Sequence, residues 1–238
     1  MKCKQIILTL LFTLMASSTL LFSEEVNVDS NSIDESSFNV GLKAGTLGVG
    51  IDVSTAINDS MSLRLNMNGF VYNKTDDSLF SHTVDSNKEY TLQTVGILLD
   101  YHLLQLRVTA GAYLNNNKIV YKAKPTDANQ FKFNGSYYGS DQIVQTETTI
   151  TFDNIAPYVG IGWGNNSNRR GWNVTFDVGL MHHGEPHIDM DVTTQASVPS
   201  PIVESINAAV EAEEKIQEED YSSFPFYPVV MVGINYSF

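Results

Sequence analysis

Apolar and polar residues alternate along most of the chain from residue 38 onward, and this alternation has the period of a β-strand. Residues 172–180 are an example: the positions occupied by tryptophan, valine, phenylalanine, valine and leucine alternate with asparagine, threonine, aspartate and glycine. Helical spacing is absent from these runs. The pattern predicts eight strands, at about 38–46, 47–58, 60–73, 89–102, 105–122, 153–165, 171–194 and 224–238.

The predicted connections fall into two length classes. Three are short turns, at 58–60, 102–105 and 165–171. Three are long polar loops, at 74–88, 124–152 and 195–223, and the first connection, 46–48, is a tight turn on the same side as these loops. An even strand number with short turns on one side and long loops on the other is typical of outer-membrane barrels. We therefore predict an all-β fold for residues 38–238, an eight-stranded antiparallel transmembrane up-and-down β-barrel with short periplasmic turns and longer outer loops.

A soluble β-sandwich is the alternative, because its strands alternate as well. Two features favour the barrel. The non-apolar face of the strands is rich in Gly, Asn, Ser and Tyr, which suits a crowded interior better than a solvated face. The last strand has five alternating apolar positions, and the fifth is the aromatic Phe238. This is expected of a strand that closes against the first and engages the barrel-assembly machinery.

The N-terminal residues predict export. Lys2 and Lys4 precede an apolar run at 6–22, the layout of a signal peptide over residues 1–23, and a polar lead follows at 24–37. An uncleaved anchor is the alternative, but threonine and serine dilute the run, whose strongly apolar part is too short to span a membrane. The mature protein is therefore expected in the outer membrane.

Composition excludes several classes of protein. The chain has 238 residues with 14 basic and 27 acidic side chains, a formal net charge of −13, and this balance argues against nucleic acid as a partner. Only 17% of residues are charged and 11% are aromatic, which argues against disorder. The single cysteine, Cys3, excludes a disulfide framework and a cysteine-based metal cluster.

Placing each strand by its apolar face puts six charges on the inner face, each from a different strand. They are Lys43, Asp52, Arg64, Asp100, Arg107 and Asp177. An eight-stranded barrel is only wide enough to be filled by side chains, and buried charges must be paired. Two interpretations follow: a salt-bridge network that plugs the barrel, or a polar path for a small zwitterion or cation.

Aromatic residues near the predicted strand ends are expected to form the girdles that lie at headgroup depth. The candidates are Tyr72, Tyr101, Trp163, Trp172, Tyr236 and Phe238. A platform on which ligands stack is the alternative.

The sequence indicates neither a catalytic site nor a metal site. His182, His183 and His187, with Glu185 and Asp189, could suggest a metal site, but neighbours on a strand face opposite ways unless Gly184 and Pro186 bend the chain. Ser81–His82 has no convincing catalytic partner, and no G-x-S-x-G occurs. We expect no enzyme, no metal and no cofactor.

The last long loop is predicted to hold one short acidic helix. Ile202, Ile206, Val210 and Ile216 recur at near-helical spacing, and Pro201 suits a first turn. This stretch has seven acidic residues and one basic residue, Lys215. Its acidic face could bind divalent cations that bridge lipopolysaccharide, or the helix could simply be solvated.

Several segments resemble the small Gram-negative outer-membrane barrels of the CarO (carbapenem-susceptibility-associated) family. They are 153–162 (DNIAPYVGIG), Gly171-Trp172, Asp177-Val178-Gly179, Gly184-x-Pro186 and 228–233 (PVVxVG). The resemblance implies an eight-stranded monomeric barrel with suggested uptake of small basic amino acids such as ornithine. It carries no functional residue across, because the matching residues are structural.

These observations predict an outer-membrane barrel that allows passive passage or uptake of small polar solutes through a narrow charged lumen. A closed barrel that stabilises the envelope or presents surface loops to partners is the alternative. The expected partners are membrane lipid, lipopolysaccharide, the assembly machinery and small polar solutes.

Overall fold

The computed structural model describes residues 38–76, 85–103, 105–125, 130–164, 170–222 and 225–238. The predicted signal peptide and polar lead, as well as Ser81–His82, lie outside the described residues. The rest belongs to one compact unit, residues 34–238.

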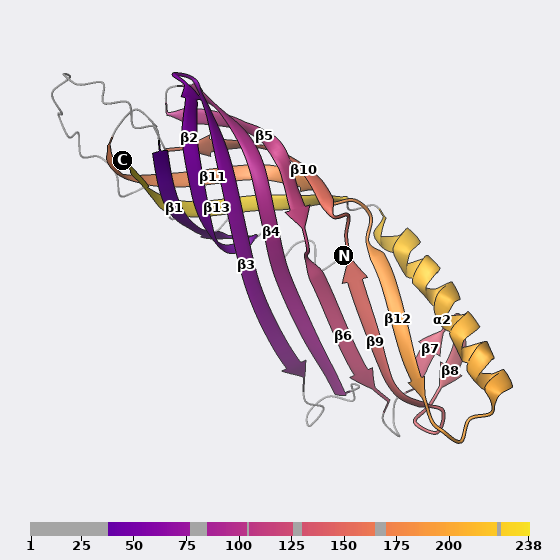
Figure 1. Ribbon diagram of the computed structural model, residues 1–238. Helices are drawn as coiled ribbons and strands as arrows, with labels where there is room; N and C mark the ends of the chain where they lie inside the picture. Colours follow the sequence, from indigo (N-terminus) through magenta and orange to yellow (C-terminus); the bar gives the residue numbers. More distant parts are fainter. Residues whose placement is uncertain (1–37, 77–84, 104, 126–129, 165–169, 223–224) are drawn as a thin grey trace, which may run out of the picture. The chain divides into compact units, whose positions relative to one another are not determined.

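The described residues form thirteen strands and one helix (Figure 1). Their bounds are β1 Phe38–Gly45, β2 Gly48–Asn58, β3 Met61–Asp76, β4 Asp85–Leu103, β5 Leu106–Asn115, β6 Lys118–Lys124, β7 Phe131–Phe133, β8 Ser136–Tyr138, β9 Ile143–Thr151, β10 Ile155–Trp163, β11 Gly171–His182, β12 His187–Thr194, α2 Ser200–Tyr221 and β13 Phe226–Ser237. All pairings are antiparallel, and the helix lies in the last long connection, so the prediction of an antiparallel β fold with a helix there is confirmed. None of the described residues forms a helix that combines the length and apolarity needed to cross a membrane.

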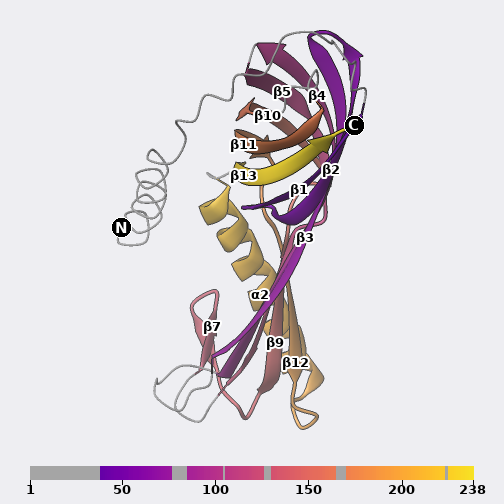
Figure 2. The ribbon, with the colours of Figure 1, turned by 90° about the vertical axis from the view of Figure 1, so that its left-hand side faces the viewer.

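Eight of the described strands form a cyclic series of pairings, in which each strand pairs with two others of the series. From β1 the succession runs through β2, β3, β4, β5, β10, β11 and β13, and β13 pairs again with β1. Figure 2 shows β13, β11, β10 and β5 following one another on one side of this set. We call these eight strands the strand ring. Its connections β2–β3, β4–β5 and β10–β11 lie at one end, which we call the short-turn end.

The sheet has eleven strands, three more than the sequence predicted, because β4 exchanges its partner along its length. Thr94–Leu103 of β4 pairs with β5, whereas Asp85–Thr91 pairs with β6, which is followed by β9 and β12. The far parts of β3 and β4 with β6, β9 and β12 form a second stretch of sheet, which we call the extension (Figure 1).

The differences from the predicted segments have local causes. The predicted loops 74–88 and 124–152 are partly strands, since β3 runs to Asp76, β4 starts at Asp85, and β7, β8 and β9 lie within 131–151. The predicted strands 105–122 and 171–194 each break in two. The second break contains Gly184 at φ 75°, where a side chain would collide with Asp153.

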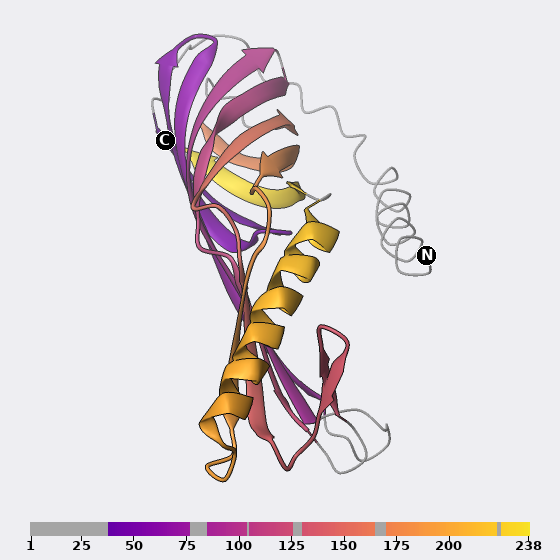
Figure 3. The same ribbon diagram turned by 90° about the vertical axis from the view of Figure 1, so that its right-hand side faces the viewer.

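The unit has two separate apolar clusters. One lies inside the strand ring and includes Leu98, Tyr113, Tyr158 and Met231. The other lies between α2, β12, β9 and the β7–β8 hairpin, and its members include Ile143, Ile188, Ile206 and Val210. Figure 3 shows α2 running along the extension. The strand ring therefore holds one core and the extension another.

Candidate functional site: a charge network inside the strand ring

All six charged residues predicted for the inner face lie inside the strand ring and are buried, with at most 5% of their surface exposed. Lys43 comes from β1, Asp52 from β2, Arg64 from β3, Asp100 from β4, Arg107 from β5 and Asp177 from β11. Strand alternation alone brings them to one side, because each is flanked by outward apolar residues.

The six side chains form a cycle in which cations and anions alternate. Lys43 pairs with both Asp52 and Asp177, at 2.6 Å from its Nζ to Asp177 Oδ2. Arg64 donates to Asp52 Oδ2 at 3.4 Å and to Asp100 Oδ1 at 2.9 Å, and its Nε lies 2.8 Å from Asp100 Oδ2. Arg107 Nε lies 3.8 Å from Asp100 Oδ1, and Arg107 also donates to Asp177. Three cations and three anions thus leave no net charge, which is how buried charges are tolerated.

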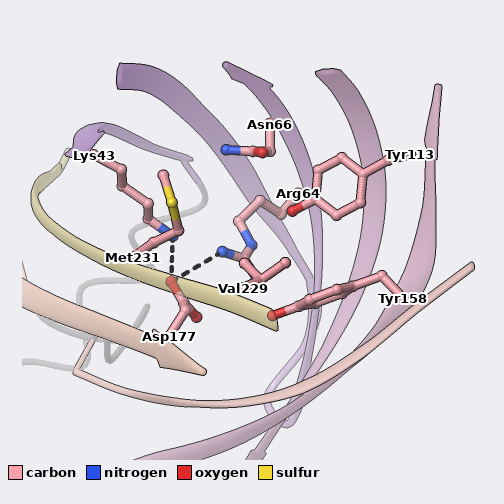
Figure 4. Close-up of a pocket in the computed structure, with 8 residues that line it drawn as sticks. All are labelled: Lys43, Arg64, Asn66, Tyr113, Tyr158, Asp177, Val229 and Met231. Carbon is pink, nitrogen blue, oxygen red and sulfur yellow. Dashed lines mark hydrogen bonds and ion pairs between the residues drawn. The ribbon is translucent and has the colours of Figure 1, made fainter. Parts of the chain in front are cut away.

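One ion pair crosses the interior of the strand ring. Arg64 Nη1 lies 3.6 Å from Asp177 Oδ2. β3 and β11, which carry these two residues, are four steps apart in either direction around the succession of pairings. Figure 4 shows Asp177 reached by both Lys43 and Arg64. The network therefore extends from one wall to the opposite wall.

Glycines provide the space for these side chains on the two strands of the ring that carry no charge. Gly162 of β10 is paired with Asp177 on one side and with Arg107 on the other, and a Cβ there would lie 2.6 Å from Arg107 Nε and from Asp177 Oδ1. Gly233 of β13 is paired with Lys43, whose Cγ would lie 2.5 Å from an added Cβ. The sequence patterns did not single out these two glycines as part of a site, although both lie at inward positions of their strands.

Neutral side chains complete the hydrogen bonding of the carboxylates. Thr109 Oγ1 donates to Asp100 Oδ1, and Asn66 Nδ2 donates to Asp52 Oδ1, both at 2.5 Å. Both residues are buried. They were also missed, because uncharged polar residues are frequent on the inner face and nothing marks these two. Their donors help to offset the desolvation of the acids.

Apolar and aromatic side chains fill the ring beyond the charges, away from the short-turn end. The Tyr113 and Tyr158 rings meet edge to face with centroids 5.4 Å apart, and Val229 and Met231 pack in the same cluster. A cavity of about 10 Å³ remains between this cluster and Lys43, Arg64 and Asp177 (Figure 4). That is the space of about one water molecule.

Five of the six predicted girdle residues lie near the short-turn end. Tyr101, Trp163, Trp172, Tyr236 and Phe238 are at or next to the ends of their strands. Trp172 and Tyr236 are in ring contact at 5.3 Å, and Tyr236 and Phe238 at 4.9 Å. Tyr72 differs, because it lies in the extension opposite Tyr90 and on the face that carries Arg64 earlier in the same strand.

The histidines after β11 do not converge. Among the described residues, no group of three or more His, Cys, Asp or Glu side chains is placed to hold a metal ion. His187 Nε2 lies 3.3 Å from Asp153 Oδ1, whereas the His183 ring packs edge-on against Phe152. Burial, followed by the proximity of His182, lowers the pKa of His183.

Comparisons with known proteins support the fold. No protein-family model matches the chain, and no curated protein matches it. Two crystal structures from Acinetobacter baumannii are similar, CarO2 with a TM-score of 0.54 at 18% identity and CarO with 0.53 at 20%. The matches cover 84% and 85% of this chain and 98% and 97% of those proteins. The chain therefore has a CarO-like fold, in agreement with the family that its strand and turn residues resemble.

Proposed function

We propose that the chain is an outer-membrane protein whose strand ring is a closed eight-stranded barrel across the membrane. Its outward residues support this, since Ile97, Ile155, Ile161 and Trp172 are each more than 60% exposed. Large apolar side chains exposed on every outward face of a strand ring need a lipid environment. An export signal at residues 1–23 is the matching prediction at the N-terminus.

We propose further that this barrel is closed to solutes and acts as a stable envelope anchor that presents the extension outside. The observation that carries this is the Arg64–Asp177 pair across the interior, beside a cavity that holds about one water. Removing one partner from a buried ion-pair network leaves uncompensated charge and costs about 3–5 kcal/mol, so opening a path through these charges is unfavourable. Apolar packing by Tyr113 and Tyr158 closes the same interior on the side of the long connections.

The extension is the part of the protein that this function would offer to partners. It has its own apolar core under α2, and α2 contributes Ile206 and Val210 to it. A barrel whose task ended at the membrane would not require a second packed core beyond it. A barrel that presents the extension at the cell surface therefore accounts for both the strand ring and the extension.

Passage of small polar solutes, including basic amino acids, is the second candidate function. One observation favours it: the Lys43 ammonium lies between Asp52 and Asp177, so the ammonium of a basic solute could take its place. The same six residues would then serve as stepping sites instead of a plug.

Planar-bilayer recording of the refolded mature protein distinguishes the two functions. The closed barrel predicts a silent bilayer, with or without ornithine or arginine. The charge-neutral double variant Arg64→Ala/Asp177→Ala should conduct, while Lys122→Ala/Glu147→Ala, which removes a 3.0 Å pair from the extension, should stay silent. Folding of every variant is checked by heat-modifiable gel mobility. Discrete openings of the unaltered protein that respond to ornithine would contradict the closed barrel and support uptake.

A further inference from the structure

A second and larger pocket lies where the extension leaves the strand ring. Its volume is about 350 Å³, near the lower end of the range for small-molecule sites. Nine residues line it: Thr91, Gln93, Asn115, Asn116, Asn117, Lys118, Thr151, Phe152 and Asn154. Seven of the nine are amide or hydroxyl side chains, and no carboxylate is among them. It is separate from the charge network inside the ring.

Strand alternation places this pocket on the outward face of the strands. In β4 the outward residues Leu99 and Ile97 are exposed, and Gln93 and Thr91 continue the same row. In β5, Leu114 is 57% exposed and Asn116 follows it in phase. The pocket therefore begins where the outward apolar band ends, which is headgroup depth for a barrel in a membrane.

The walls of the pocket are held in place by hydrogen bonds within the chain. The Gln93 backbone N–H donates to Asn117 Oδ1 at 2.8 Å, and Asn115 Nδ2 donates to the Asp153 carbonyl at 3.1 Å. The Asn115 N–H donates to the Asn154 carbonyl at 2.8 Å. Asn115 and Asn117 are almost fully buried. A pocket with fixed walls loses little entropy when it takes a ligand.

Three further amide side chains at the pocket are available for a ligand. Gln93, Asn116 and Asn154 are exposed, and their side chains form no hydrogen bond within the described part of the chain. An amide both donates and accepts, as a sugar hydroxyl does. Phe152 adds an apolar ring surface and Lys118 one positive charge, whereas an apolar ligand would leave the amides without partners.

We propose that this pocket binds a hydroxyl-rich sugar ring. Its place at the end of the apolar band points to the headgroup of an outer-leaflet glycolipid as the source, and a free saccharide has the same chemistry. Lys118 would then face a phosphate substituent. The inference that the sugar belongs to a lipid rests on the proposed outer-membrane function, while the sugar chemistry rests on the pocket alone.

Native mass spectrometry of the refolded full chain in detergent tests the proposal. The probes are lipopolysaccharide without O-antigen, phosphatidylglycerol and a free glucosamine disaccharide. The double variant Asn116→Leu/Asn154→Leu removes two amides at the pocket. The matched control is Asn87→Leu, an exposed asparagine on the outward face of β4 away from the pocket.

The unaltered protein and Asn87→Leu should retain lipopolysaccharide in preference to phosphatidylglycerol. The double variant should bind it about tenfold more weakly. Equal binding by all three proteins, or equal retention of phosphatidylglycerol, would overturn the sugar site. Competition by the disaccharide at similar concentration would support the sugar site and overturn the lipid source.

Insertion of each protein into vesicles of phosphatidylglycerol and phosphatidylethanolamine, followed by heat-modifiable mobility, is measured in parallel. Failure to insert would count against the barrel function, and insertion without sugar binding would count against the pocket alone.

Discussion

The strand ring and the extension share β3 and β4, and along β4 the apolar row passes from the outward face to the inward face. In the ring part of β4, the outward residues Ile97 and Leu99 are apolar and the inward residue Asp100 is charged. Further along the same strand, the inward row continues with Leu92 and Tyr90, and the outward row becomes polar. The phase of the strand does not change along its length. Under the proposed function only the environment of each face changes, from lipid outside the ring to water around the extension.

The two regions therefore stabilise themselves by different means. The interior of the ring has six buried charges that depend on complete pairing, so the loss of one partner leaves another charge without compensation. The extension buries Ile188, Ile206 and Val210 between a sheet and a helix, as a water-soluble domain does. A single substitution should consequently affect only the region in which it lies.

The largest effect is expected in the ring from Asp177→Ala. Asp177 contacts all three cations of the network, so its removal leaves three positive charges facing two negative ones. We expect a loss of about 3–5 kcal/mol in unfolding free energy, measured by urea denaturation in detergent micelles. Asp189→Ala, on an exposed position of β12, should change it by less than about 0.5 kcal/mol. The double variant Lys43→Ala/Asp177→Ala should recover part of the loss, and equal effects of Asp177→Ala and Asp189→Ala would contradict a paired network.

A comparable but local effect is expected in the extension from Ile206→Ala. The Ile206 side chain is fully buried under α2, and removal of such a side chain costs about 2–5 kcal/mol. Limited proteolysis should cut α2 and β12 faster, while the heat-modifiable gel mobility that reports on the strand ring stays unchanged. Ile202→Ala, one turn earlier and 41% exposed, is the control and should leave proteolysis unaltered. Loss of the heat-modifiable gel mobility in Ile206→Ala would show that the strand ring and the extension fold as one.

Gly162→Ala tests whether the ring interior is as tightly filled as the charge network implies. The added Cβ would press on Arg107 and Asp177, and overpacking of this kind costs about 1–3 kcal/mol. Gly69→Ala is the control, because its nearest neighbour would be the Leu92 carbonyl oxygen at 3.8 Å, an ordinary contact. Urea denaturation compares the two variants. An equal response would mean that the interior can rearrange.

The sequence predicted the inside of the ring well because alternation is a local signal. Period two assigned Arg64 and Asp100 to the inner face before any pairing was known, and all six charges do meet. The cycle itself could not be predicted, because it depends on strand register and on Gly162 and Gly233 opposite the charges. Register is set by long-range pairing that one sequence does not display.

The extension escaped prediction for a different reason. β9 contains threonine at 146, 148, 149 and 151, so it lacks the apolar alternation that marks a strand, although threonine favours strands. In β4 the apolar row changes from odd positions at Ile97 to even positions at Leu92 and Tyr90, but the sequence pattern predicts residues 89–102 as one uniform barrel strand. The helix was predicted in the right connection because Ile202, Ile206 and Val210 repeat at helical spacing, which is again local, although it was expected to be short and spans 22 residues.

The smallest expected effect concerns the free edge of the extension. Among the described strands, β12 pairs only with β9. The N–H groups of Ile188 and Met190 in β12 donate to Glu218 and Glu214 of α2, at 2.9 and 2.6 Å. Two glutamates one helical turn apart thus match two amides two residues apart on a strand, and they protect an edge that could otherwise pair with another chain. Glu214→Gln/Glu218→Gln keeps the shape but weakens charge-assisted bonds, so these two amides should exchange hydrogen about fivefold faster, a change of about 1 kcal/mol. Glu211→Gln, an exposed residue of the same helix, is the control. Unchanged exchange at Ile188 and Met190 would mean that α2 protects the edge by packing alone, and the acidic character of the helix would then have to be explained by contacts outside the chain.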